Sequence, residues 1–409
     1  MKALGWTRRL AALLALASVG WASPVHAETA DEARPELASE AAVLIEAKTG
    51  TVLYARNAEK QEYPASITKI VTGIVAIEDE RDMSATVTVS KEARGEDGTR
   101  VYLAEGEKLP LLNLLYGMLM NSGNDAATAI AEYVDGSKAK FAERMNEFAK
   151  DKIGAANTHF VNPSGLPDPR QYTTAMDMAK ITRYAMQNEL FRTIVGTRRM
   201  PWNGQEWKSE LINHNEMLGQ YEGTTGVKNG YTGDAGFTLV TSAKRDGMEL
   251  IGVLLKSPSK SLLYQDMTKL LDYGFRQFEL QRVSAANPAY PLAAEANFVQ
   301  TGPMYAAVPK GETPAVSVAP DGTVTVRTSL GDAEAGRLQP SVPSLAAIAA
   351  RYPAVKAAAL HADGNKRAPE PGAVTKAEIF VVWIGMLIYL GLIAAIRAKR
   401  QRLERERSF

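Results

Sequence analysis

Three short groups of residues could together carry out acyl transfer, and they follow one another along the chain. They are Ser66-Ile67-Thr68-Lys69, Ser122-Gly123-Asn124 and Lys228-Asn229-Gly230. Their side chains would supply a nucleophile, a base, a proton relay and a cation that receives an anion. This set of groups needs neither a histidine nor a metal ion.

The spacing of Ser66 and Lys69 predicts that the two side chains share one face of a helix. An apolar-periodic stretch runs from Ile67 to about Glu80, so Ser66 would lie at the helix N-terminus, where the dipole favours negative charge. If Lys69 is buried beside another cation, its pKa falls and its neutral amine can accept the serine proton. The alternative is a helix-capping serine followed by a surface lysine.

The other two groups also have ordinary alternatives. Ser122-Gly123-Asn124 lies at a predicted break between two helices within 109–134, where a chain reversal could aim both side chains into a cleft. Ser, Gly and Asn are equally common in plain turns. Lys228-Asn229-Gly230 precedes a predicted strand pair, and its glycine would let a substrate approach a strand edge. A lysine that merely protects an edge strand is the alternative.

Copies of the same motifs occur elsewhere, at Ser137–Lys140, Ser257–Lys260 and Lys48-Thr49-Gly50. We predict that Ser137 starts a solvated helix and that Ser257 caps one. Lys48-Thr49-Gly50 is predicted to be the turn of a hairpin within 41–55. The single motifs therefore carry little information, and their order and flanking residues must decide.

The elements that would position these groups predict an α+β fold. Strands are expected within 41–55 and at 237–243 and 248–256, and further helices at 138–152, 174–188 and 259–279. Strands at both ends with helices between them predict one antiparallel sheet with an inserted helical cluster. After residue 280 the chain becomes richer in Pro, Val and Thr, with short strands expected at 315–318 and 323–328.

Composition excludes several classes of function. The chain has no cysteine, so disulfides, thiolate nucleophiles and Cys-ligated zinc are excluded. Its four histidines are scattered, which argues against a Ser-His-Asp triad or a His-rich zinc site. The net charge is +1 and the basic residues form no stripe, so no nucleic-acid partner is expected. We predict no cofactor and no metal.

Both ends of the chain predict export and anchoring. Basic residues, a short apolar run and Val25-His26-Ala27 indicate a signal peptide at 1–27. A continuous apolar stretch from Ile379 to Ile396 is long enough to span a bilayer, and a basic tail at 398–409 follows it. The positive-inside rule then keeps the tail cytoplasmic and places the body on the outer face of a cell membrane, as a single-pass protein. The alternative is a buried helix of the body.

Taken together, the motifs and their flanks resemble a known family, the low-molecular-mass penicillin-binding proteins. These are serine D-alanyl-D-alanine carboxypeptidases of peptidoglycan metabolism. The resemblance rests on 64–70, 119–127 and 226–232, and also on 160–166 and 172–179. It covers roughly residues 38–280 and implies the penicillin-recognising, β-lactamase-like serine hydrolase fold. Together with the composition of the later segments, it predicts a catalytic domain at 28–280, a small β domain at 281–345, an Ala/Pro/Lys-rich linker at 346–376 and a transmembrane helix at 377–397.

The resemblance also implies roles for individual residues. Ser66 would attack the carbonyl between the two terminal D-alanines of a stem peptide, with Lys69 as base and Ser122 as proton relay. Asn124 would contact the substrate or position Lys69, and Lys228-Asn229-Gly230 would receive the terminal carboxylate. The N–H groups of Ser66 and Tyr231 would form the oxyanion hole. β-Lactam antibiotics would acylate the same serine.

One position departs from the family pattern, because Asn229 stands where the family usually has Thr or Ser. Its amide can donate a hydrogen bond as a hydroxyl can, but it is longer and planar. A β-lactamase of the same fold is disfavoured because the loop 162–170 contains no glutamate. A D-Ala-cleaving endopeptidase and a non-catalytic scaffold of the same fold stay open as alternatives.

Overall fold

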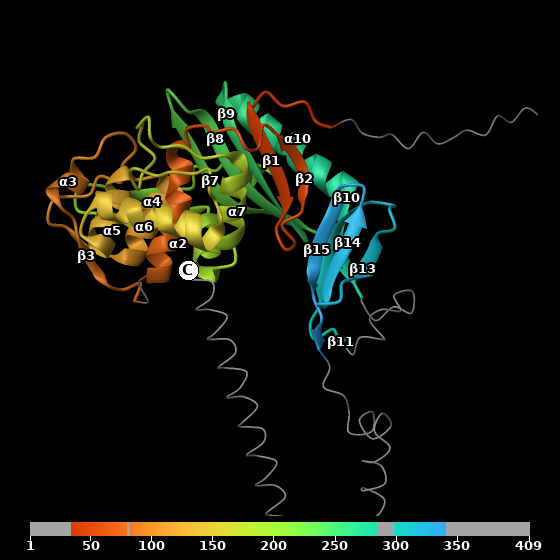
Figure 1. Ribbon diagram of the computed structural model, residues 1–409. Helices are drawn as coiled ribbons and strands as arrows, with labels where there is room; N and C mark the ends of the chain where they lie inside the picture. Colours follow the sequence, from red (N-terminus) through yellow and green to blue (C-terminus); the bar gives the residue numbers. More distant parts are fainter. Residues whose placement is uncertain (1–33, 80–81, 285–297, 341–409) are drawn as a thin grey trace, which may run out of the picture. The chain divides into compact units, whose positions relative to one another are not determined.

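The computed structural model of the protein describes residues 34–79, 82–284 and 298–340. A five-stranded antiparallel sheet forms its centre, in the order β2-β1-β9-β8-β7. The strands are β1 (Ala41–Glu46), β2 (Val52–Arg56), β7 (Thr224–Thr232), β8 (Gly236–Arg245) and β9 (Met248–Ser257). Strands from both ends of the predicted catalytic region therefore pair in one sheet, as expected from the sequence, and β7 is an edge strand (Figure 1).

The sheet is buried on both faces, which explains why β1 is apolar almost throughout. Side chains alternate across a strand, so Val43 and Ile45 enter one core while Ala42 and Leu44 enter another. The first core lies under the helical cluster, and the second lies under α10 (Lys260–Gln277). Each fully buried Ile or Leu contributes about 1.5–3 kcal/mol relative to an exposed one.

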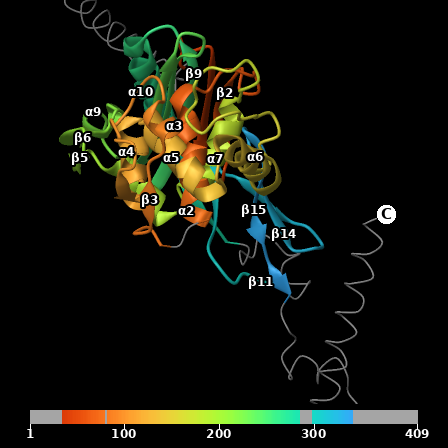
Figure 2. The same ribbon diagram turned by 90° about the vertical axis from the view of Figure 1, so that its left-hand side faces the viewer.

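The helical cluster covers one face of the sheet and holds the first two motif groups (Figure 2). Its main helices are α2 (Lys69–Asp79), α4 (Leu111–Asn121), α5 (Asn124–Asp135), α6 (Lys138–Glu147), α7 (Ala175–Ala185) and α8 (Glu189–Gly196). Shorter elements are α3 (Lys91–Arg94), α9 (Met217–Gln220), the 3₁₀ turn η1 (Ala65–Thr68) and the π-helical turn η2 (Phe148–Ile153). Two small hairpins pair β3 (Thr86–Thr88) with β4 (Lys108–Pro110), and β5 (Arg199–Asn203) with β6 (Lys208–Ile212).

The region after α10 is built of strands. They are β10 (Phe278–Val283), β11 (Phe298–Val299), β12 (Met304–Pro309), β13 (Ala315–Val318), β14 (Thr323–Thr328), β15 (Gly331–Arg337) and β16 (Gln339–Pro340). β10 pairs with β12, β11 pairs with β16, and β13, β14 and β15 form a three-stranded sheet. Buried side chains including Val308, Val324 and Val326 form a separate core here. The two short strands predicted from the sequence are β13 and β14.

The α+β class and the antiparallel sheet are confirmed, whereas the predictions for the two ends fall outside the described residues. These are the signal peptide at 1–27, the linker at 346–376, the transmembrane helix at 377–397 and the tail at 398–409. Across 34–79, 82–284 and 298–340, no helix is both long and apolar enough to cross a membrane.

Candidate active site

Ser66 lies in the 3₁₀ turn immediately before α2, and the backbone around it is tightly confined. Ala65 has a φ of +49°, a left-handed conformation that costs a non-glycine residue about 1–2 kcal/mol. Gly165 packs on this turn so closely that a Cβ there would lie 1.9 Å from the Ala65 carbonyl oxygen. Gly230 approaches from the other side, where a Cβ would lie 2.6 Å from the Ser66 backbone nitrogen. Two glycines therefore set the position of the nucleophile.

Lys69 is the first residue of α2, and its side chain is fully buried beside Ser66. Its Nζ lies 3.1 Å from Ser66 Oγ, 2.7 Å from Asn124 Oδ1 and 2.5 Å from the Ser164 carbonyl oxygen. The last two oxygens can only accept hydrogen bonds. A neutral amine with two N–H groups would donate to both of them, which leaves its lone pair facing the Ser66 hydroxyl. The alternative of a surface lysine behind a capping serine is excluded.

The electrostatics of the site favour this neutral amine. Burial, followed by the charge of Lys228, holds the pKa of Lys69 well below its usual value, although Asp125 and Glu96 act in the opposite direction. Asp125 does not pair with Lys69. Its carboxylate accepts hydrogen bonds from the backbone N–H groups of Val101, Leu103 and Ala126.

Ser122 and Asn124 occupy the break between α4 and α5, as the sequence predicts. Ser122 has a φ of +62°, and it ends α4 in a left-handed conformation that turns the chain. Asn124 begins α5, where its backbone N–H donates to the Thr99 carbonyl over 2.7 Å. Its Nδ2 donates to the Asp97 carbonyl over 2.6 Å, so Oδ1 is the atom turned toward Lys69. Asn124 is thus placed to orient the lysine.

The third group lies within the edge strand β7. Lys228 is 1% exposed, so it is not a surface lysine that protects the edge. Burial lowers the pKa of Lys228 to about 7. Its Nζ donates to the Asn229 carbonyl over 2.8 Å and to Asn229 Oδ1 over 3.3 Å. Among the side chains the structure describes, the Asn229 Nδ2 amide has no hydrogen-bond partner, and Asn229 lines the cleft described next.

The three groups meet at one cleft of about 500 Å³. Ser66, Ser122, Asn229, Gly230 and Tyr231 line it, while Lys69, Asn124 and Lys228 are buried nearby. Tyr231 is 58% exposed and packs against Phe237 with ring centroids 4.4 Å apart. The roles assigned to these residues stay predictions, but all eight predicted site residues belong to one neighbourhood.

The other copies of the motifs lie in structural positions. Ser137 caps α6 by accepting from the Lys140 N–H, and Lys48-Thr49-Gly50 forms the β1–β2 turn, where the Glu46 carboxylate holds it. The prediction that Ser257 caps a helix was wrong. Ser257 ends strand β9, and Ser259 caps α10 instead, because the strand continues through the motif before the chain turns.

Sequence analysis gave no role to several residues of the site. Asn162 Oδ1 accepts from the backbone N–H groups of Ser164, Gly165 and Leu166, and so shapes the loop whose Ser164 carbonyl contacts Lys69. The resemblance to the family at 160–166 is the sequence signal that points to this loop. His214 also lines the cleft. Burial, then the nearby lysines, lowers the pKa of His214 to about 4, so it is neutral at pH 7.

In the described part of the chain, no group of His, Asp and Glu side chains could hold a metal ion.

Comparison with known proteins gives a consistent result. The family model described as D-alanyl-D-alanine carboxypeptidase matches residues 27–259. The chain is 38% identical over 251 residues to the D-alanyl-D-alanine carboxypeptidase DacF of Bacillus subtilis, a match that covers 60% of this chain and 64% of that protein. It is 33% identical over 285 residues to the D-alanyl-D-alanine carboxypeptidase of a Streptomyces species, a match covering 64% of this chain and 94% of the relative.

Solved structures share the fold. The D-alanyl-D-alanine carboxypeptidase DacD from Francisella tularensis superimposes with a TM-score of 0.62 at 26% identity, over 76% of this chain and 95% of that one. The Streptomyces K15 DD-transpeptidase superimposes with a TM-score of 0.56 at 31% identity, over 59% of this chain and 99% of that one. The chain spans 64–65% of the length of the Bacillus subtilis relative and of DacD from Escherichia coli.

Proposed function

Since this chain belongs to the D-alanyl-D-alanine carboxypeptidase family, we propose that it removes the terminal D-alanine from the pentapeptide of peptidoglycan through an acyl-enzyme on Ser66. One observation carries this proposal. A fully buried lysine with a lowered pKa lies 3.1 Å from the Ser66 hydroxyl, and its two other contacts are neutral oxygens. This is the arrangement that activates a serine without a histidine.

Acylation begins when Ser66 Oγ attacks the carbonyl carbon between the two terminal D-alanines. The Ser66 proton passes to the Lys69 amine as the Oγ–C bond forms. The C–N bond then breaks, and the Ser122 hydroxyl relays a proton to the leaving amine of the last D-alanine. The products of this step are free D-alanine and an ester on Ser66.

Substrate binding uses the edge of β7. Lys228 and the amide of Asn229 receive the terminal carboxylate. Asn229 lines the cleft and its Nδ2 is available to donate, while Lys228 is buried beside it with Nζ 3.3 Å from Asn229 Oδ1. The backbone N–H groups of Ser66 and Tyr231 form the oxyanion hole, and loss of one such donor typically costs about 10²–10³ in rate. The close packing of Gly230 on the Ser66 nitrogen supports this role, since it brings β7 against the nucleophile.

Water completes the cycle by hydrolysing the ester. β-Lactams acylate the same serine, and the loop 162–170 offers no glutamate to activate water against that ester. The loop instead turns a backbone carbonyl, that of Ser164, toward Lys69. We therefore propose that penicillin remains bound as a covalent adduct rather than being rapidly hydrolysed.

The protein would work on the outer face of the cytoplasmic membrane. The predicted signal peptide at 1–27, the apolar stretch from Ile379 to Ile396 and the basic tail at 398–409 support export and a single C-terminal anchor.

The proposal is tested by incubating the full-length protein in mild detergent with a muropeptide pentapeptide and, separately, with a cross-linked dimer. Mass spectrometry should find free D-alanine from the pentapeptide, and Ser66→Ala should abolish its release. Ser137→Ala is the matched control, since Ser137 belongs to another Ser-x-x-Lys copy and only caps a helix.

Other outcomes identify the alternatives. Cleavage of the dimer alone would replace the carboxypeptidase with an endopeptidase. Transfer of the acyl group to an added amino acceptor in place of water would make the protein a transpeptidase. Failure of the wild-type protein to be labelled by fluorescent penicillin would favour the non-catalytic scaffold.

A further inference from the structure

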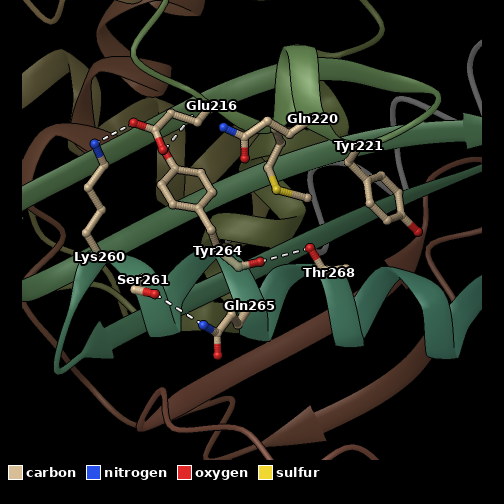
Figure 3. Close-up of a pocket in the computed structure, with 9 residues that line it drawn as sticks. Glu216, Gln220, Tyr221, Lys260, Ser261, Tyr264, Gln265 and Thr268 are labelled. Atoms are coloured by element: carbon tan, nitrogen blue, oxygen red, sulfur yellow. Dashed lines mark hydrogen bonds and ion pairs between the residues drawn. The ribbon is translucent and has the colours of Figure 1, made fainter.

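A second cavity of about 700 Å³ adjoins the catalytic cleft. It lies between α9 and α10 (Figure 3). Glu216, Lys260 and Tyr264 line both hollows, so the second cavity continues the first. Nothing in the proposed chemistry uses this extension.

An ion pair marks the boundary between the two hollows. Lys260 Nζ pairs with Glu216 Oε1, and the two side chains are 55% and 40% exposed (Figure 3). Tyr264 also lies at this boundary, where its hydroxyl donates to the His214 carbonyl over 3.1 Å and accepts from the Glu216 N–H over 3.3 Å. These two hydrogen bonds hold the backbone next to the ion pair in place. An exposed ion pair contributes only about 0–1 kcal/mol, so a ligand that occupies both hollows can displace this pair at little cost in free energy.

The other side chains of the cavity are uncharged. Gln220 and Gln265 supply amides, Ser261 and Thr268 supply hydroxyls, and Tyr221 supplies a ring. The two charged side chains, Lys260 and Glu216, already neutralise each other. In the described part of the chain Gln220 has no hydrogen-bond partner, and Gln265 uses only its Nε2, which donates to Ser261 Oγ over 3.1 Å. Amides, hydroxyls and a tyrosine ring suit a neutral ring that carries hydroxyl and acetamido groups.

The expected substrate contains such a ring close to its reactive end. A stem peptide extends from an N-acetylated amino sugar, and five fully extended residues span at most about 18 Å. When the D-alanine end is in the cleft, the sugar must therefore lie near it. A second stem peptide is a poorer match, because its carboxylates would meet a cavity whose cation is already paired.

We propose that the cavity between α9 and α10 is a glycan subsite that holds the N-acetylated sugar of the peptidoglycan unit being trimmed. This inference rests on the proposed function for the identity of the substrate. The subsite would make the enzyme selective for peptides that still carry their sugar, because it strengthens substrate binding without changing the chemical step.

The test compares two substrates that differ only in the sugar. The full-length protein is given the disaccharide pentapeptide and the same pentapeptide with an acetyl group in place of the disaccharide. Gln220→Ala and Gln265→Ala should each lower kcat/KM for the disaccharide substrate about 3- to 10-fold, through KM, because each removes a hydrogen bond. The sugar-free peptide should be unaffected. Gln187→Ala is the matched control, because Gln187 is exposed and lies outside both hollows.

Two outcomes of this comparison overturn the inference. Equal losses on both substrates mean that the cavity holds peptide, and no loss on either means that it holds no part of the substrate. Ser261→Trp fills the cavity with a larger side chain, so it tests the subsite independently of the two amides.

Binding of the peptide-free disaccharide separates this inference from the proposed function. Saturation-transfer NMR should detect the disaccharide on the wild-type protein and lose it on Ser261→Trp, even if neither pentapeptide is hydrolysed. Absence of disaccharide binding to a protein that does release D-alanine would refute the subsite and leave the carboxypeptidase intact.

Discussion

Replacement of Gly165 by alanine should disable Ser66 without altering any side chain predicted to do chemistry. A Cβ at position 165 would lie 1.9 Å from the Ala65 carbonyl oxygen and 3.0 Å from the Ser66 nitrogen. Real Cβ contacts essentially never fall below 3.0 Å, so the Ala65 peptide must move by about 1 Å. That peptide carries the Ser66 N–H, which is a predicted oxyanion donor.

The expected effect has two separable parts. Gly165 has a φ of +86°, and an alanine in this region costs about 1–2 kcal/mol of stability. Displacement of a reacting group by about 1 Å can cost on the order of 10²-fold in rate. Acylation should therefore fall on the order of 10²-fold in protein that is still folded.

The assay measures the rate of acylation by fluorescent penicillin and the free energy of unfolding in urea. Gly154→Ala is the matched control. Gly154 has a φ of +74°, but no atom lies within 4 Å of a Cβ built there. Gly154→Ala should lose about 1–2 kcal/mol of unfolding free energy from the backbone conformation alone and keep the wild-type acylation rate. A folded Gly165→Ala protein that is acylated at the wild-type rate would refute the reasoning.

Three further predictions concern the charged and amide groups of the site. Burial lowers the pKa of Lys228 to about 7, so the unfolded chain binds more protons than the folded protein between pH 7 and 10.5. The free energy of unfolding should thus rise with pH in this range, and Lys228 should contribute up to about 1.4 kcal/mol per pH unit. Urea titrations at several pH values test this. If the free energy of unfolding rises with pH equally steeply in Lys228→Met and in the wild type, the prediction is contradicted. Asn229→Thr should release D-alanine at the wild-type rate or faster, whereas Asn229→Ala should raise KM about 5- to 10-fold because a hydrogen bond is lost. A large loss of activity in the threonine variant would show that asparagine is specifically required. Asn124→Asp should place a carboxylate beside Lys69 Nζ and raise the pKa of Lys69. Acylation by penicillin should therefore fall at pH 7 and recover as the pH is raised. Asn124→Ala introduces no charge, so its acylation rate should show no such recovery at higher pH.

Local features of the site could be predicted from the sequence because local chemistry determines them. The helix break at Ser122 follows from a Ser-Gly-Asn run between apolar stretches, and the structure places it between α4 and α5. The start of α2 beside Ser66 follows from Pro64 and the apolar periodicity after it. The turn at Lys48-Thr49-Gly50 follows from a glycine-containing run between two strand-like stretches within 41–55, and the structure places it between β1 and β2.

Contacts between distant segments could not be predicted in this way. Ser164 lies 95 residues from Lys69, and its contribution is a backbone carbonyl, which any residue carries. His214 reaches the cleft just after the β5–β6 hairpin, whose strands show only weak apolar alternation. The cavity proposed as a glycan subsite depends on the approach of α9 to α10, and nothing in the sequence of either helix signals that approach.

The proposed role of Lys69 as a base depends on which groups do not contact its amine as much as on those that do. A carboxylate beside its amine would keep it protonated and unable to accept a proton. Asp125, the nearby buried acid, is instead held by three backbone N–H groups. The amine therefore contacts only neutral oxygens, and burial together with the charge of Lys228 lowers its pKa, although Asp125 and Glu96 act in the opposite direction. In the proposed mechanism Lys228 thus has two roles, because the cation that would receive the substrate's carboxylate also lowers the pKa of Lys69, the lysine that would take the proton of Ser66.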